Sequence, residues 1–161
     1  MDFKAGDRVV YPNHGIGIIE DVEQKEAGGL LCSFYCLRIL ANDTVVMIPT
    51  KNADTVGLRK TISRRDVTSL FEQLRNGRVK ASASWKGRYK ENSDRMRTGS
   101  IFEVAAVLKN LSTLSRSKSL SYREKRMLDK ARQLVVSEVA EVQRAPAEKI
   151  SAQIDSALTG H

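Results

Sequence analysis

The sequence predicts an α+β protein of two domains. Residues 1–60 are expected to form a small antiparallel β barrel or curled sheet, and residues 61–161 a bundle of about five helices. Apolar and polar residues alternate up to Arg59, and afterwards apolar residues recur with the 3.6-residue period of a helix. The chain has 161 residues, 41% hydrophobic and 29% charged, which suits two small folded domains.

Four β-rich runs joined by tight turns make up the first domain. Pro12 and Pro49 end the first and last runs, Gly15 and Gly17 can take positive φ in the first turn, and the Gly28–Gly29 pair predicts a hairpin. The runs are residues 7–12, 16–27, 30–40 and 44–49. A sheet this small is expected to leave an edge that a strand from another protein can join.

Five helical segments follow a domain boundary near residues 58–62. They are residues 63–76, 85–98, 100–114, 121–143 and 145–158. Three begin with a serine followed three residues later by an acidic residue, which is typical of a helix start: Ser63–Asp66, Ser100–Glu103 and Ser121–Glu124. Pro146 suits the first turn of the last helix. Residues 76–84 are predicted to be a loop inside the helical domain.

The net charge of +8 is uneven along the chain. Residues 1–60 carry seven Lys and Arg against eight Asp and Glu, whereas residues 64–132 carry 18 against seven. This distribution suggests two modules with two partners, and the basic module suits a polyanion such as nucleic acid.

The two cysteines, Cys32 and Cys36, predict neither a disulfide nor a metal site. Four residues apart on a strand they would lie about 13 Å from each other, too far for a bond. Two ligands without a second pair also make a poor zinc site. We expect buried or half-buried thiols.

The sequence shows no apolar run of membrane-spanning length and no signal peptide, so a cytoplasmic location is expected.

Known catalytic motifs are absent from the sequence. It contains no P-loop, no GxGxxG after a strand and no HExxH. The only histidines, His14 and His161, have no obvious nucleophile or acidic partner. We therefore expect no enzyme, no catalytic residues, no metal site, no cofactor and no small-molecule substrate.

The single tryptophan, Trp85, begins a predicted helix rich in Lys and Arg. On that helix it shares a face with Tyr89, Asn92 and Met96. Two interpretations stay open for Trp85: a core residue, or an exposed ring that stacks on a partly unstacked base. A second helix start is also crowded with cations: Arg123, Lys125, Arg126, Lys130 and Arg132. Together they predict a surface that follows phosphates without reading base edges.

Four motifs run in order through almost the whole chain. They are FKAGDRVVYPNHGIG (3–17), VMIPTKNADTVGLR (46–59), SWKGRYKEN (84–92) and LSYREKRMLDKARQLVVSEVA (120–140). Together they resemble the CarD/CdnL family of bacterial transcription regulators. The first domain is also similar to the RNA polymerase-interacting domain of transcription-repair coupling factors, whose helicase motors this chain lacks.

The resemblance implies a Tudor-like first domain that binds the β subunit of bacterial RNA polymerase. It implies a helical domain that contacts promoter DNA at the upstream edge of the bubble and stabilises the open complex without a sequence-specific operator. A monomer with no membrane partner is expected. The candidate polymerase contacts are Lys25, Met47, Ile48 and Pro49. The candidate DNA contacts are Trp85, as a wedge at the fork junction, with Lys86, Arg88, Lys90, Arg97, Arg123, Lys125, Arg126, Lys130 and Arg132.

Two positions depart from the family pattern, and two other functions are weighed against it. Gly87 stands where some relatives carry an arginine, which weakens the expected grip on DNA, and Met47 replaces an arginine of some relatives. One alternative is a general nucleic-acid-binding or ribosome-associated protein whose barrel binds RNA, although the barrel is the acidic half. The other is a structural adaptor without affinity for DNA.

Overall fold

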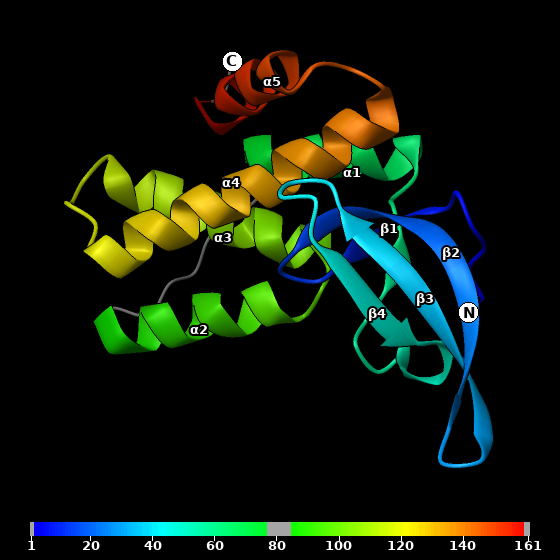
Figure 1. Cartoon of the computed structure of the whole chain (residues 1–161). Coiled ribbons are helices and arrows are strands. Elements are labelled where there is room, and N and C mark those ends of the chain that lie inside the picture. The colour runs from blue at the N-terminus through cyan, green and yellow to red at the C-terminus, as the bar shows by residue number, and fades with distance from the viewer. Residues whose placement is uncertain (1, 77–84, 160–161) are drawn as a thin grey trace. The chain divides into compact units, whose positions relative to one another are not determined.

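The computed structural model describes residues 2–76 and 85–159, without the side chains of Ala27, Trp85 and Lys86 (Figure 1). The chain divides into two compact units, Met1–Thr61 and Ile62–His161, which we call the β unit and the helical unit. An antiparallel sheet precedes five helices, which confirms the predicted α+β class. Most of the predicted loop 76–84 lies outside the described residues.

The β unit contains one five-stranded sheet with the order β4-β3-β2-β1-β5, and neighbouring strands are antiparallel. The strands are β1 (Arg8–Tyr11), β2 (Gly15–Ala27), β3 (Leu30–Ile39), β4 (Val45–Pro49) and β5 (Arg59–Lys60). The fifth strand was not predicted, because its two residues are too few to show an alternating pattern. It pairs with Val9 and Val10 of β1.

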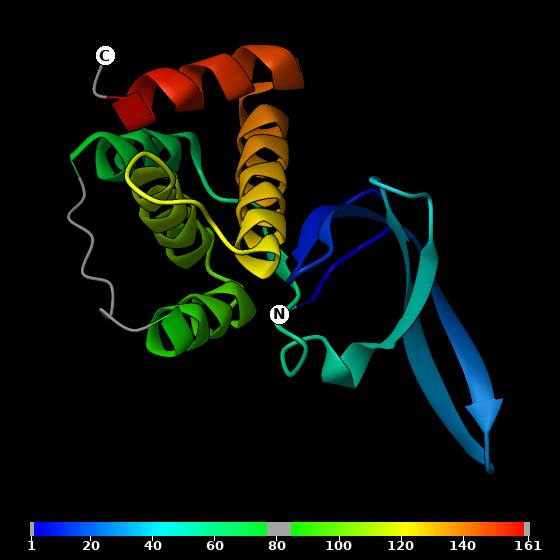
Figure 2. The same ribbon diagram turned by 90° about the vertical axis from the view of Figure 1, so that its left-hand side faces the viewer.

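The hairpin of β2 and β3 extends beyond the rest of the sheet, as Figure 2 shows. Strand β1 pairs with β2 only as far as Ile18, and β4 joins β3 only from Phe34 onwards. The predicted turn at Gly28–Gly29 is present, and both glycines have positive φ. Leu30 and Leu31, directly after this turn, are strongly exposed.

The core of the β unit lies against one face of this sheet. Tyr35 stacks edge-on with Phe3 at 5.7 Å between ring centroids, and its hydroxyl accepts a hydrogen bond from the Phe3 N–H. Gly17 is required for space, and not for the positive φ that we predicted, because a Cβ there would lie 2.6 Å from the Leu37 side chain. The buried residues of this core cluster are Phe3, Val9, Ile19, Tyr35, Leu37, Ile39, Ile48, Ala53 and Leu58.

The helical unit contains the five predicted helices within two residues of their expected bounds. They are α1 (Arg64–Asn76), α2 (Trp85–Arg97), α3 (Ile101–Ser115), α4 (Tyr122–Gln143) and α5 (Ala147–Thr159). The Ser63 hydroxyl accepts a hydrogen bond from the Asp66 N–H, and Ser121 with Glu124 forms the predicted capping box. No helix in the described part of the chain is long and apolar enough to cross a bilayer.

The predicted capping box at the start of α3 is wrong. Ser100 occupies the N-cap position, but its side chain makes no capping hydrogen bond. The Glu103 carboxylate lies 3.7 Å from the Arg95 guanidinium of the preceding helix instead. An ion pair with α2 thus replaces the local contact that the serine and glutamate suggest.

Helix α3 packs against α1, α2 and α4, and α5 covers α1 and α4. Two polar side chains reinforce this core. The buried Glu138 carboxylate of α4 accepts a hydrogen bond from the Ile62 N–H at 2.9 Å, holding the first residue of the helical unit. The Lys109 ammonium donates to the carbonyl oxygens of Leu74 and Arg75 and so caps the end of α1.

Candidate functional site

Strand β4 is an edge of the sheet and holds three of the four residues predicted to contact polymerase. Within the described residues its only strand neighbour is β3, so the backbone groups on its other side are outside the sheet. Met47 is 37% exposed, whereas Ile48 is only 3% exposed and packs in the core. Ile48 can therefore serve a partner through its backbone only. Pro49 is half-buried and ends the strand.

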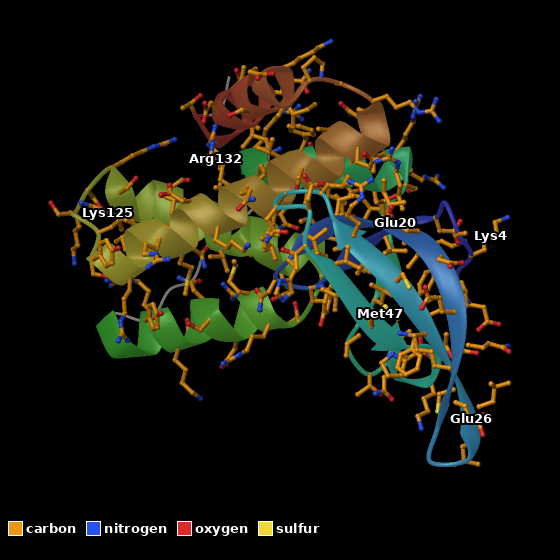
Figure 3. All side chains as sticks on the ribbon, viewed as in Figure 1. Lys4, Glu20, Glu26, Met47, Lys125 and Arg132 are labelled. Carbon is orange, nitrogen blue, oxygen red and sulfur yellow. The ribbon has the colours of Figure 1, made fainter. Side chains whose placement is uncertain are left out.

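Met47 (labelled in Figure 3) contacts the neighbouring strand β3 through its sulfur atom. The Cys36 thiol lies 3.2 Å from the Met47 sulfur and donates to it. Burial raises the pKa of the Cys36 thiol, and the neighbouring Glu23 carboxylate raises it further. Cys36 therefore stays protonated and apolar in character. Cys32 and Cys36 are free, half-buried and buried respectively, as predicted.

Lys25, the fourth predicted polymerase contact, lies apart from β4. It sits on β2 within the projecting hairpin, opposite Cys32, and β3 separates β2 from β4. Its ammonium is 3.7 Å from the Glu23 carboxylate in an exposed pair. The structure thus brings Met47, Ile48 and Pro49 together and places Lys25 on a different part of the sheet.

Arg88 of α2 is engaged inside the helical unit. Its Nε donates to Glu124 Oε2 at 2.8 Å and its Nη2 to Glu124 Oε1 at 3.3 Å. The Arg88 side chain is 12% exposed and that of Glu124 only 1%. The same carboxylate accepts hydrogen bonds from the Ser121 N–H and hydroxyl, as part of the capping box of α4. One buried carboxylate therefore joins the first turn of α2 to the first turn of α4.

The charges of this pair stabilise each other. Hydrogen bonding to Arg88 lowers the pKa of the Glu124 carboxyl despite its burial, and it raises the pKa of Arg88. Arg88 is thus engaged in this structure in an ion pair that joins the starts of α2 and α4. Its contact with DNA stays a prediction.

Arg132, also predicted to contact DNA, is engaged in this structure in contacts with α5. Its Nη2 lies 2.7 Å from Asp155 Oδ1 and 2.7 Å from the Ser151 hydroxyl, both on α5. These contacts fasten α4 to α5. Figure 3 labels Arg132 along α4 and Lys125 nearer its start. Lys125 is exposed and, among the described residues, makes no ion pair.

Four of the remaining predicted cations, Arg97, Arg123, Arg126 and Lys130, line a groove between α2 and α4. Arg123, Arg126 and Lys130 recur at helical spacing on one face of α4. Arg97 of α2, which is paired with Asp94, lies on the other side of the groove. Among the described residues, no acidic side chain lies within ion-pair distance of the three from α4. The groove has a volume of about 390 Å³. It is lined by Tyr89, Ser93, Met96, Arg97, Arg123, Arg126, Met127 and Lys130.

Trp85 and Lys86 occupy the first two positions of α2, but their side chains lie outside those that the structure describes. Further along the face predicted for Trp85, Asn92 and Met96 are buried. The side-chain amides of Asn92 and Asn110 of α3 lie 3.1 Å apart. Lys90 is exposed. Both interpretations of the tryptophan, core and exposed ring, therefore stay open.

Sequence reasoning missed two features of this site. Tyr122, the first residue of α4, is 73% exposed, and the Arg126 guanidinium lies 5.8 Å from the centroid of its ring. The tyrosine follows the Ser121 cap directly, so its position at an exposed first turn was available from the sequence. The partner of Arg88 was not, because 36 residues separate it from Glu124.

Family models match each unit. The model described as the CarD-like/TRCF RID domain matches residues 3–62, and the model described as the CarD C-terminal domain matches residues 69–155. The two matches follow each other along the chain and together span most of it.

A curated protein and a solved structure are also similar. YdeB of Bacillus subtilis (strain 168), a protein provisionally named as a transcription factor, is 35% identical over 137 residues, which is 85% of this chain and 90% of YdeB. The structure CdnLNt from Myxococcus xanthus shares 45% identity, covers 40% of this chain and 90% of its own, and superposes with a TM-score of 0.34.

Proposed function

This chain belongs to the CarD/CdnL family of transcription factors, and from that membership we propose that it acts on the promoter complex by binding at two places. The β unit binds the β subunit of RNA polymerase. The helical unit contacts promoter DNA at the upstream edge of the bubble. The result is a longer-lived open complex, reached without sequence-specific readout and without a catalytic step or cofactor.

The observation that carries this proposal is the separation of two different surfaces on two units. The β unit, nearly neutral, offers an open strand edge, and the helical unit offers a basic groove. Each unit is matched by its own family model, and the model of the β unit is shared with transcription-repair coupling factors. A pairing edge suits a protein partner, whereas a cluster of cations suits phosphates.

Strand β4 is the proposed polymerase contact. Its outward backbone groups can extend a sheet in the partner, and the exposed Met47 side chain adds apolar area beside them. Ile48 supports the strand from the core, and Pro49 fixes where pairing ends. Lys25 acts separately, as a charge on the hairpin.

The proposed DNA contacts are the exposed cations and the start of α2. Lys90 and Lys125 reach phosphates from outside the groove, and Trp85 with Lys86 lies where α2 begins. The groove cations Arg97, Arg123, Arg126 and Lys130 add to the same surface. Arg88 and Arg132 are left out of the phosphate contacts, because Glu124 and Asp155 hold their guanidinium groups and their side chains are only 12% and 30% exposed. Arg97 is kept because its side chain, although paired with Asp94, is 67% exposed. Phosphate contacts of this kind position a protein without reading sequence.

Two measurements test the two halves of this proposal. The purified chain should capture an isolated β subunit, and it should lengthen the lifetime of an open complex after a competitor is added. A Met47→Glu variant should lose both effects, because it cannot reach the promoter without polymerase. Capture of RNA or ribosomes in place of the β subunit would instead support a general nucleic-acid-binding protein.

A further inference from the structure

We propose that the groove between α2 and α4, extended by Tyr122, binds an unpaired strand of DNA. The tyrosine ring stacks on one base, and the cations of the groove rim hold the neighbouring phosphates. This inference deepens the proposed function and rests on it, because an unpaired strand at a promoter arises where the duplex opens. It assigns a second aromatic contact, on a different helix from Trp85.

The exposure of Tyr122 is the first observation. A ring that is 73% exposed forgoes the burial that aromatic side chains usually gain. The Arg126 guanidinium, one helical turn further on, lies 5.8 Å from the ring centroid, within the range of a cation–π contact. The ring is therefore held in place at the surface by a neighbour that is itself charged.

Arg126 also connects the ring to the groove. It lines the groove together with Arg123 and Lys130, so the stacking position and the cations are continuous. Arg123 and Lys130 lie seven residues apart, which corresponds to a rise of roughly 10 Å along α4. The capping box already uses the Glu124 N–H of α4, so this amide plays no part here.

The combination of a ring and cations selects the ligand. In a duplex each base is stacked on its neighbours, so an aromatic side chain can stack only where a neighbour has been lost. Exposed aromatics beside a positively charged groove are the features that bind single strands without sequence preference. A lone charged face would bind duplex and single strand through phosphates alike. Tyr122 therefore favours the unpaired strand.

Fluorescence anisotropy of the full chain with three labelled ligands tests this at low salt. The ligands are dT12, a 12-base-pair duplex and rU12. Tyr122→Ala should weaken dT12 binding about 5- to 150-fold, the range for one lost base stack. The duplex affinity should change less than about 2-fold. Tyr122→Phe keeps the ring and should stay within about 2-fold of the unchanged protein on all ligands.

Matched variants control for apolar area and for charge. Leu30→Ala removes an exposed apolar side chain from the β unit, and Lys149→Ala removes an exposed charge from α5; neither should change dT12 binding much. Arg123→Ala, inside the groove, should lower it more than Lys149→Ala does. Thermal melting of every variant shows whether the fold is kept. An oligonucleotide with 5-iodouracil should in addition cross-link to Tyr122 in the unchanged protein.

Several outcomes would overturn the inference. One is that Tyr122→Ala weakens the binding of dT12 and of the duplex equally. Another is that Tyr122→Ala and Tyr122→Phe have equal effects on dT12 binding. A third is that the cross-links map only to residues other than Tyr122. Tighter binding of rU12 than dT12 would overturn the assignment to DNA. Unchanged dT12 binding with lost β-subunit capture would make Tyr122 a protein contact. If the unchanged chain captures no β subunit while Tyr122→Ala still weakens dT12 binding, the proposed function fails and the strand site stands.

Discussion

Replacing Arg88 by alanine should destabilise the helical unit far more than the loss of one surface charge would. Arg88→Ala leaves the 1% exposed carboxylate of Glu124 without its cation. Breaking a buried ion pair from one side typically costs about 3–5 kcal/mol. For a unit of this size about 4–5 °C of melting temperature corresponds to 1 kcal/mol, so the melting temperature should fall by roughly 12–25 °C.

A double variant separates the buried charge from the lost packing. Arg88→Met with Glu124→Gln removes both charges, keeps most of the volume and leaves an amide oxygen for Ser121 to donate to. Its cost should be at most about 1–2 kcal/mol, since a buried pair is often replaceable by neutral groups of similar size. Differential scanning calorimetry and chemical denaturation of the single and double variants measure the difference.

The pair also predicts a response to acid. Because Arg88 lowers the pKa of Glu124 in the folded chain, the carboxylate stabilises the fold above its unfolded pKa of about 4.3. That contribution is lost as the pH falls through the lower folded pKa. The unchanged protein should therefore lose more stability than the double variant between about pH 4 and the acid limit of folding.

A specific result would refute this reasoning. If Arg88→Ala melts within about 2 °C of the unchanged protein while its affinity for DNA falls, the guanidinium binds phosphate and the ion pair is not structural. If the variant is unstable but binds DNA normally at a temperature where it is folded, Arg88 is a positioning residue as the structure indicates.

Three further predictions concern the two proposed surfaces. Met47→Glu and Pro49→Asp should reduce β-subunit capture without unfolding the chain, and unchanged capture by both would exclude β4 as the contact. Lys90→Ala and Lys125→Ala should each weaken DNA binding on all sequences alike and reduce the slope of log K against log salt by about 1, whereas a strong preference for one duplex at high salt would contradict this. Trp85→Ala should shorten open-complex lifetime about 5- to 150-fold with little change in melting temperature; a large loss of stability would mean that the ring is core.

The arrangement of strands and helices was predictable because it depends on local patterns. The glycine pair of the β2–β3 hairpin and the serine caps of α1 and α4 act within a few residues of themselves. Strand β5 was not predicted because its two residues are too few to show an alternation of apolar and polar side chains. The capping box at Ser100 does not form because the Ser100 N–H donates to the Thr98 hydroxyl and Glu103 lies beside Arg95, two contacts that the pattern does not reveal.

The candidate site was predictable in composition but not in the role of each cation. Counting basic residues correctly located two crowded helix starts, but a count cannot say which charges are already satisfied. Glu124 and Asp155, distant in sequence, hold Arg88 and Arg132. The groove depends on how α3, which packs against both α2 and α4, places these two helices, and a sequence pattern does not reveal that placement.

The hydrogen bond between Glu138 and the Ile62 N–H has a mechanical consequence. If polymerase holds the β unit while DNA holds the helical unit, tension between them enters the helical unit at its first residue. The N–H of that residue is hydrogen-bonded to Glu138 of α4, and α1 begins only two residues later, at Arg64. Part of the load can therefore pass directly to α4, whose other end carries Tyr122 and one side of the basic groove.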